Sequence, residues 1–345
     1  MDGKFLNTLF IQTRAATLRR DHRTIAVILE KKTVLTVPIH QIEAVVVWGG
    51  VHVTPSCMAL CTSNGVAVNF LTASGRFLAR VVEPGHGSVL LRKAQFRASD
   101  CPVQSLPLVR SFVAGKLKNT RGLLVRAARE TDSPSSIQAL QTGADKIENS
   151  LTQLPFVDSI DALRGHEGIS ALVYFSLFNL LIRTDNPFFK MNGRTRRPPL
   201  DAVNCLLSFF YGLLLQDCCS AVSHYGLDPA VGFLHADHPG RPSLALDLME
   251  EFRPILADRL TLAMINRQQI QENHFDLQET GAVLLRESGR KVVLAAWQQR
   301  KKEEVTHPLL KRKVPIGMVF SLQARVLAKA IRGELPLYLP YTPRN

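Results

Sequence analysis

The sequence lacks the paired cysteines that a zinc ribbon or a disulfide framework requires. Its 345 residues contain six cysteines and no Cys-x-x-Cys pair. Cys57 and Cys61 stand at helical spacing, whereas Cys218 and Cys219 are adjacent, a placement that rarely suits a disulfide. A zinc ribbon is therefore excluded, and we expect unbridged, buried thiols in a protein of the reducing cytoplasm.

The motifs of several common enzyme classes are also missing. Gly49 and Gly50 have neither a GxGxxG nor a P-loop context, so we expect no nucleotide site. His235 and His238 form a His-x-x-His pair, but a zincin needs His-Glu-x-x-His on a helix, and Pro239 breaks a helix here. No motif for an activated serine or cysteine nucleophile is present either.

Targeting and membrane-spanning segments are not expected. The beginning, MDGKFLNTLF, lacks a basic region followed by an apolar core, as a signal peptide would have. The most apolar stretch lies between Asp201 and Asp217, and a stretch of this length is too short to span a bilayer. We expect it to form a buried helix.

Composition indicates a folded protein with an excess of basic residues. Hydrophobic residues make up 46% and charged residues 21% of the sequence, and 345 residues exceed one comfortable hydrophobic core. The formal net charge is +13 and the pI is about 9.7. A charge of this size favours a polyanionic partner, most commonly nucleic acid, although a merely basic cytosolic protein is the alternative.

The residue pattern changes once along the chain. The first eighty-odd residues contain short runs rich in Val, Ile and Thr between turn residues, interrupted by one helix with Thr54 as its N-cap and Pro55 at its first position. After the loop at 83–88, apolar residues recur at helical spacing. The sequence predicts an α+β, two-domain protein, with a small β domain over 1–85 and an all-α domain over 86–345.

Two acids near residue 250 are candidate functional residues. Asp247 and Glu250 are three positions apart, so on a helix they face the same way, and apolar neighbours predict that this helix is buried. A buried carboxylate must be paired, hydrogen-bonded or bound to a metal. Glu167 is a further candidate at the beginning of an apolar helix, where it would also suit the helix dipole.

One histidine completes a possible metal-binding set. His235 follows an apolar pair after the glycine at 232, and a lone histidine in such a place is often a hydrogen-bonded loop residue. Two carboxylates and one imidazole, however, form a mixed oxygen and nitrogen set that suits Mg²⁺ or Mn²⁺. Together with the basic composition, this set favours phosphodiester chemistry.

Three blocks of the sequence carry a resemblance to a known family. They are LRGHEGISALVYF (163–175), GRTRRPPLDAVNCLLSFFYGLLL (193–215) and GLDPAVGFLHADHPGRPSLALDLMEEFRP (226–254), and further similarity extends over the whole chain. The sequence resembles the CRISPR-associated spacer-acquisition integrase, the metal-dependent DNA endonuclease that is the first of the Cas proteins. Its form in subtype I-C systems is the most similar.

The resemblance implies a fold, a reaction and a site. The fold is an N-terminal β-sandwich, used for dimerisation, followed by a helical catalytic domain. The reaction inserts new spacers into a CRISPR array by attack of a DNA 3′-hydroxyl on a phosphodiester of the repeat. Glu167, His235 and Glu250 would be catalytic and would bind the metal, although some members have aspartate in the third position. Asp247 would support the site, and Arg164 would contact either a substrate phosphate or an acid.

The resemblance also implies partners and a DNA-binding surface. The partners are double-stranded DNA (protospacer and repeat), a second copy of the chain, the small ferredoxin-like second Cas protein and a RecB-like fourth one. We expect residues 42–53 to present exposed strands for the homodimer. A non-catalytic DNA-binding scaffold of the same fold and a metal hydrolase of small substrates are the alternatives. The basic residues expected to hold DNA are Lys116, Lys118, Arg121, Arg194, Arg196, Arg197 and Arg241.

Overall fold

The computed structural model describes residues 7–343 apart from residues 74, 76 and 83–88. Strands come first and helices follow, so the predicted order of a β-rich part and a helical part is confirmed. The predicted linker at 83–88 lies outside the described residues. The chain divides into two compact units, the first drawn from residues 1–86, 294–304 and 315–318 and the second from the remainder.

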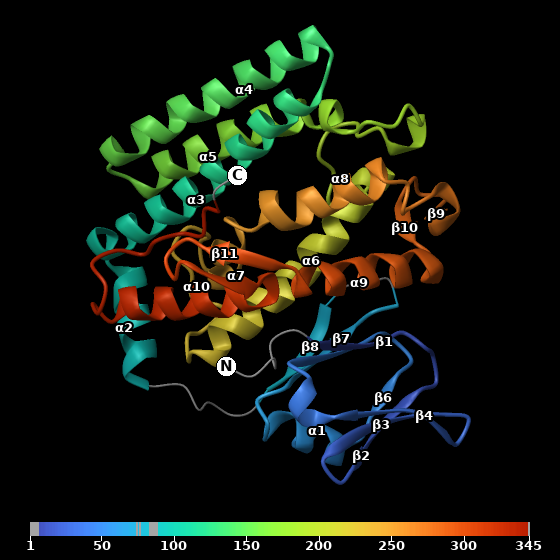
Figure 1. Cartoon of the computed structure of the whole chain (residues 1–345). Coiled ribbons are helices and arrows are strands. Elements are labelled where there is room, and N and C mark those ends of the chain that lie inside the picture. The colour runs from blue at the N-terminus through green and yellow to red at the C-terminus, as the bar shows by residue number, and fades with distance from the viewer. Residues whose placement is uncertain (1–6, 74, 76, 83–88, 344–345) are drawn as a thin grey trace. The chain divides into compact units, whose positions relative to one another are not determined.

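Two four-stranded sheets share one hydrophobic core in the first unit (Figure 1). Leu18, Ile25, Val45 and Val68 contribute to this core from four different strands. The strand order is β1-β5-β7-β8 in one sheet and β4-β3-β2-β6 in the other. The strands are β1 (Thr8–Ile11), β2 (Thr17–Asp21), β3 (Thr24–Leu29), β4 (Lys32–Pro38), β5 (Ala44–Val47), β6 (His52–Val53), β7 (Ala67–Leu71) and β8 (Phe77–Val81).

The expectation that residues 42–53 present exposed strands is wrong for β5, whereas His52 in the short edge strand β6 is exposed. Strand β5 is central in its sheet, paired in parallel with both β1 and β7, and all four of its residues are buried. Its sequence, Ala-Val-Val-Val, is apolar on both faces, which is typical of a strand covered on both sides. The opposite edge of the sheet that contains β6 is β4, where Val34 and Leu35 are 58% and 45% exposed.

The helix predicted after Thr54 is confirmed as α1 (Pro55–Thr62). The Thr54 side chain accepts a hydrogen bond from the backbone N–H of Cys57, with Pro55 at the first helical position. Cys57 and Cys61 face the shared core, as their helical spacing predicts. All six cysteines are unbridged.

Helices dominate the rest of the chain, and α3, α4 and α5 lie side by side (Figure 1). The α-helices are α2 (Val89–Asp100), α3 (Pro102–Glu130), α4 (Pro134–Gln153), α5 (Ile160–Ser176), α6 (Ala202–His224), α7 (Ser243–Met249), α8 (Arg259–Asn266), α9 (Glu287–Lys302) and α10 (Ile316–Ile331). The 3₁₀ helices are η2 (Ile39–Gln41), η3 (Leu154–Phe156), η4 (Phe178–Leu181), η5 (Pro187–Phe189) and η7 (Glu272–His274), and η6 (Arg253–Asp258) is a π-helix.

An entirely helical C-terminal part is not what the structure contains. Two antiparallel ribbons interrupt the helices, β9 (Phe275–Leu277) with β10 (Val283–Leu285) and β11 (Glu304–His307) with β12 (Arg312–Pro315). Each strand has only three or four residues, too few for an alternating pattern to distinguish it from a loop.

Helix α6 is longer than the apolar stretch between Asp201 and Asp217, from whose length we expect no membrane-spanning segment. It spans 23 residues and, by length and composition alone, could cross a membrane, because the helix extends on both sides of the apolar stretch. The expectation that it is buried holds, since 61% of its most apolar window lies inside the protein. Leu206, Phe210 and Leu214 have no exposed surface.

Candidate active site

Asp247 fastens the loop that carries His235 to helix α7. The backbone N–H groups of Phe233 and Leu234 donate to Asp247 Oδ2 at 2.6 and 3.0 Å, and that of His235 donates to Oδ1 at 2.9 Å. The Asp247 side chain is fully buried, so these hydrogen bonds replace the water that its charge would otherwise need. Asp247 therefore shapes the loop.

Asp247 also orients the imidazole of His235. His235 Nδ1 lies 2.7 Å from Asp247 Oδ1, and a carboxylate can only accept, so Nδ1 carries the proton. Whenever the ring is neutral, its lone pair is then on Nε2, which lies 3.8 Å from Glu250 Oε1. A histidine held in this tautomer by a carboxylate is the usual arrangement for a metal ligand.

Three further contacts hold the loop in place. Gly232 lies so close to α7 that an added Cβ would stand 2.7 Å from the Cβ of Ser243, so only glycine fits. Arg164 Nε donates to the Leu234 carbonyl at 2.7 Å, and its Nη1 lies 2.7 Å from Asp161. Of the two roles expected for Arg164, the structure contains the pairing with an acid.

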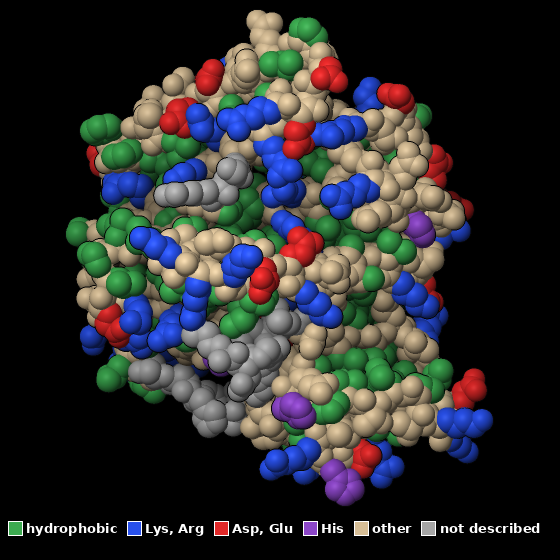
Figure 2. Space-filling view, in the orientation of Figure 1, with side chains coloured by type: hydrophobic (Ala, Val, Ile, Leu, Met, Phe, Trp, Pro, Cys, Tyr) green, Lys and Arg blue, Asp and Glu red, His purple; other side chains and the backbone are tan. Residues whose placement is uncertain are grey.

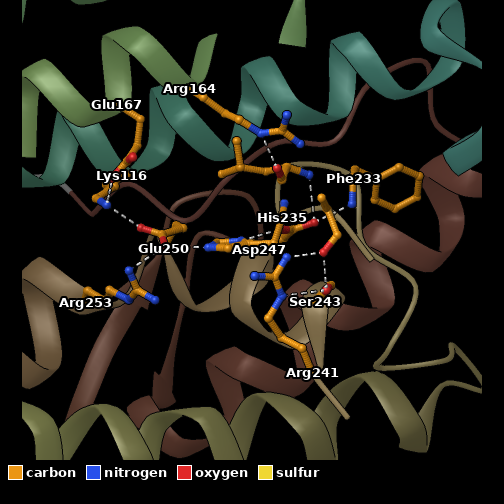
Figure 3. Close-up of polar contacts among 12 residues, drawn as sticks. Lys116, Arg164, Glu167, Phe233, His235, Arg241, Ser243, Asp247, Glu250 and Arg253 are labelled. Atoms are coloured by element: carbon orange, nitrogen blue, oxygen red, sulfur yellow. Dashed lines mark hydrogen bonds and ion pairs between the residues drawn. The ribbon is translucent and has the colours of Figure 1, made fainter. Parts of the chain in front are cut away.

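Glu167 and Glu250 meet around the ammonium group of Lys116 (Figure 3). Glu167 lies on α5, Lys116 on α3, and Glu250 caps the C-terminal end of α7. Lys116 Nζ contacts Glu167 Oε1 and lies 2.6 Å from Glu250 Oε2. Arg253 Nη1 lies 2.5 Å from the other oxygen of Glu250.

The positive surroundings of Glu250 keep its carboxylate ionised. Burial alone would raise the pKa of Glu250, whose side chain is 2% exposed, but Arg253, Lys116 and His235 together lower this pKa to about 2. Lys116 Nζ lies 2.6 Å from Glu250 Oε2, and Arg253 contacts Oε1. Glu250 therefore presents a charged carboxylate, held between two cations, inside the protein.

Sequence reasoning missed Arg253 and the residues that fix its position. The Tyr211 ring lies between two guanidinium groups, with Arg253 and Arg194 centred 5.1 and 5.3 Å from its centroid. Tyr211 and Tyr174 donate to Asp258 at 2.8 and 3.0 Å. Burial raises the pKa of Asp258 to about 6, although both tyrosine hydrogen bonds oppose the rise. Only the spacing of Glu250 and Arg253, one helical turn, could have suggested this pair.

Lys116, Arg121 and Arg194 are engaged within the protein. Lys116 pairs with the two glutamates, and Arg121 Nε lies 2.8 Å from Glu148. Arg194 donates to Asn204 Oδ1 at 2.7 Å, and burial lowers its pKa. These contacts place Lys116 and Arg194 within the fold and not on an open basic face.

Arg241 has a similar internal role, whereas three other basic residues are exposed. Arg241 donates to the Ala236 carbonyl and bridges the loop after His235. Lys118, Arg196 and Arg197 are exposed, and Arg196 lines a cavity of about 40 Å³ beside Lys116, Glu167 and Arg253. Figure 2 shows that Lys and Arg side chains are widespread on the visible face of the helical part.

The donor set is chemically suited to a divalent cation. Glu167 and Glu250 offer carboxylate oxygens, and His235 offers Nε2. The same carboxylates already attract two cationic side chains, Lys116 and Arg253. Among the residues that the structure describes, no three His, Cys, Asp or Glu side chains are arranged to hold an ion as they stand.

N-terminal strands are followed by a helical part that contains buried Glu250 beside partly exposed Glu167 and His235. These features make the chain a candidate for the class of metal-dependent nucleases. The chain matches the family described as "CRISPR associated protein Cas1" over residues 9–299, and it belongs to that family. It is 46% identical over 342 residues to "CRISPR-associated endonuclease Cas1 2" of Rhodospirillum rubrum, covering 98% of each chain. To "CRISPR-associated endonuclease Cas1 1" of Chlorobaculum tepidum it is 42% identical over 341 residues, with 99% of each covered. The expected family and its endonuclease class are thus confirmed.

One further relative is a fusion protein, and two solved structures share the fold of this chain. A "Cas4/endonuclease Cas1 fusion" of Geobacter sulfurreducens is 33% identical, and the match covers 99% of this chain and 61% of the fusion. A Cas1 protein of Thermotoga maritima has a TM-score of 0.80 at 23% identity, covering 94% and 97% of the two chains. A casposase bound to its integration product has a TM-score of 0.81 at 21% identity, covering 96% and 92%. At these identities the structures demonstrate a common fold.

Proposed function

We propose that this chain is the metal-dependent DNA endonuclease and integrase of CRISPR adaptation. In this reaction a DNA 3′-hydroxyl attacks a phosphodiester of the repeat and joins a new spacer to the array. One observation supports the proposal most strongly. Asp247 holds His235 with Nε2 3.8 Å from Glu250, and Lys116 contacts both Glu250 and Glu167, so the three proposed ligands are neighbours in the helical part.

Glu167, His235 Nε2 and Glu250 would hold Mg²⁺ or Mn²⁺. When bound, such an ion supplies Lewis-acid polarisation of the phosphoryl oxygen and lowers the pKa of the attacking hydroxyl. Asp247 keeps the His235 proton on Nδ1 and so keeps Nε2 available. Arg253, fixed against Tyr211, maintains the negative charge of Glu250 and supplies positive charge beside the reacting phosphate.

We propose exposed basic residues and exposed strand edges as contact surfaces. Arg196 and Arg197 are exposed, and Arg196 lines the cavity beside the site, so these two residues are the best placed to hold DNA phosphates. Lys118 on α3 would add to this surface. The β domain, taken as residues 1–85, would form the homodimer, with the exposed edge strand β4 as its contact.

The assembly proposal extends to other Cas proteins. A solved "Cas6-RT-Cas1--Cas2 complex" contains a chain with the fold of this one, at a TM-score of 0.81. Together with the Cas4 fusion, it supports partnership with a Cas2 protein and a Cas4 protein. We place the chain in the cytoplasm and in a subtype I-C system on the resemblance of its three sequence blocks.

The function is tested by a strand-transfer assay with a 3′-hydroxyl DNA duplex and a repeat-bearing plasmid, with and without Cas2. We expect metal-dependent joining by the wild-type protein. His235→Ala should lose this joining while it retains its melting temperature and DNA affinity, and excess Mn²⁺ should partly restore it. DNA binding with no metal-dependent joining or nicking under any of these conditions would instead identify a non-catalytic scaffold.

A further inference from the structure

We propose that Lys116 is a built-in competitor of the metal. Its ammonium occupies the place between Glu167 and Glu250 that a divalent ion would take, and the ion binds only when this ammonium moves away. The inference rests on the proposed function, because it assumes that these two glutamates are metal ligands. It assigns to Lys116 a role that its position on a basic helix does not suggest.

The geometry supports direct competition. Lys116 is the one residue that contacts both proposed carboxylate ligands in the described part of the chain, and it reaches them from a third element, α3 (Figure 3). Its side chain is 13% exposed, so the ammonium is largely withdrawn from water. An ion ligated by Glu167 and Glu250 would have to stand within bonding distance of oxygens that Lys116 now contacts.

The charges at the site point in the same direction. Glu167 and Glu250 carry two negative charges, and Lys116 and Arg253 carry two positive charges, so these four groups are balanced. A divalent ion added to this set would leave two positive charges in excess within a few ångströms. Repulsion of this kind is strong in a poorly hydrated site, so the ion and the ammonium exclude one another.

Of the two cations, Lys116 is the one able to leave. Arg253 is held by the Tyr211 ring as well as by Glu250, and its guanidinium is rigid and planar. A lysine ammonium is a point charge on a flexible stem, and Lys116 borders the 40 Å³ cavity into which its stem can turn. We therefore infer that the ammonium moves and Arg253 stays.

Competition of this kind couples metal binding to DNA binding. With the ion in place and Lys116 displaced, the site has surplus positive charge, which a phosphodiester would offset. DNA should then raise the affinity for the ion, and the ion should raise the affinity for DNA by the same factor. Without DNA, Lys116 would lower the affinity of the site for the metal and so restrain the nuclease.

The test measures Mn²⁺ affinity without DNA by isothermal titration of the full chain. Lys116→Met removes the charge and keeps a long apolar stem, and the control is Lys146→Met, which removes an exposed charge on the neighbouring helix α4. We expect Lys116→Met to bind Mn²⁺ about tenfold tighter than wild type, with Lys146→Met unchanged. Adding a short DNA duplex should reduce the difference in Mn²⁺ affinity between Lys116→Met and wild type. Equal or weaker binding by folded Lys116→Met would overturn the competition.

A second measurement uses the wild-type protein and needs no variant. Mass spectrometry follows the acylation of lysines by an amine-reactive ester, with and without Mn²⁺. Mn²⁺ should increase the labelling of Lys116 several-fold and leave Lys118 unchanged, and unchanged labelling of Lys116 at saturating Mn²⁺ would overturn the inference. The failure of the proposed function looks different: neither wild type nor Lys116→Met would then bind Mn²⁺ in a way that Glu250→Gln abolishes.

Discussion

Glu250 and Glu251 are neighbours in the chain, and both are buried, with 2% and 0% of the residue exposed, yet their surroundings are opposite in character. Lys116 and Arg253 contact Glu250, and the pKa of this carboxyl is lowered to about 2. Glu251 faces the other side, toward the C-terminal segment. Its neighbours are neutral, and burial raises the pKa of Glu251 to about 8.

Glu251 holds the C-terminal segment by hydrogen bonds. Tyr338 Oη and the backbone N–H of Tyr341 donate to Glu251 at 2.9 and 3.0 Å, and Gln323 donates at 3.2 Å. Gly115 permits this approach, because a Cβ there would lie 2.6 Å from Pro340. Burial alone thus does not distinguish a functional carboxylate from a structural one. The two acids differ in the direction of the pKa shift and in the charge of their neighbours, and on this difference we propose Glu250 alone as a metal ligand.

The largest effect should come from Glu250→Gln. This change keeps the shape of the side chain and removes the charge that gathers Lys116, Arg253 and the proposed ion. We expect strand transfer to fall by about two to three orders of magnitude, since metal stabilisation of the transition state is worth several kcal/mol. Glu251→Gln is the matched control and should transfer strands within about threefold of wild type. Similar losses of strand transfer in Glu250→Gln and Glu251→Gln would contradict the functional distinction between the two acids.

Glu251→Ala should affect stability and spare the chemistry. It leaves Tyr338, Gln323 and the Tyr341 amide without their buried acceptor, which should lower the free energy of unfolding by about 2–4 kcal/mol. Chemical denaturation measures this loss. Strand transfer per folded molecule should be unchanged at a temperature well below the melting point, and a loss of activity in the folded variant would contradict the assignment.

Glu251 should also give stability a pH dependence that Glu251→Gln lacks. The pKa of Glu251 is about 8 in the folded protein against 4.5 in the unfolded chain, so the folded state holds the proton more tightly. Its contribution to stability is complete below pH 4.5 and is lost as the pH rises to about 8. Melting temperatures measured across this window should fall more for wild type than for Glu251→Gln. If the melting temperatures of wild type and Glu251→Gln changed equally with pH, Glu251 would be ionised in the folded state.

The arginines at 194–197 also differ in their surroundings, because Arg194 is held within the protein whereas Arg196 and Arg197 are exposed. Reversing exposed Arg196 and Arg197 to Glu should weaken binding to all duplexes alike, by about tenfold, and flatten the salt dependence. Arg194→Glu should instead lower the melting temperature, because Arg194 is held by Asn204 and the Tyr211 ring. Fluorescence anisotropy at several salt concentrations measures the first effect, and sequence-dependent losses would show that Arg196 and Arg197 contact bases.

The sequence predicted features that depend on residues close together in the chain, and it did not predict contacts between distant segments. Thr54 and Pro55 specified α1, and the three-residue spacing of Asp247 and Glu250 predicted that both acids face the same way. The family resemblance, and not the spacing, indicated that His235 lies with them. Lys116 was expected to hold DNA, and its contact with the two glutamates could not be predicted, because it reaches them from α3 and no sequence spacing encodes that contact. Glu251 could not be distinguished from Glu250 for the same reason, since its partners lie more than seventy residues away.

We propose that the Glu250 carboxylate binds a divalent ion and that the Glu251 carboxylate does not. Electron paramagnetic resonance of Mn²⁺, titrated into wild type, Glu250→Gln and Glu251→Gln with a short DNA duplex present, tests it most directly. We predict that Glu250→Gln loses bound Mn²⁺ and that Glu251→Gln binds as wild type does. Wild-type affinity in Glu250→Gln, or an equal loss in Glu251→Gln, would contradict the claim.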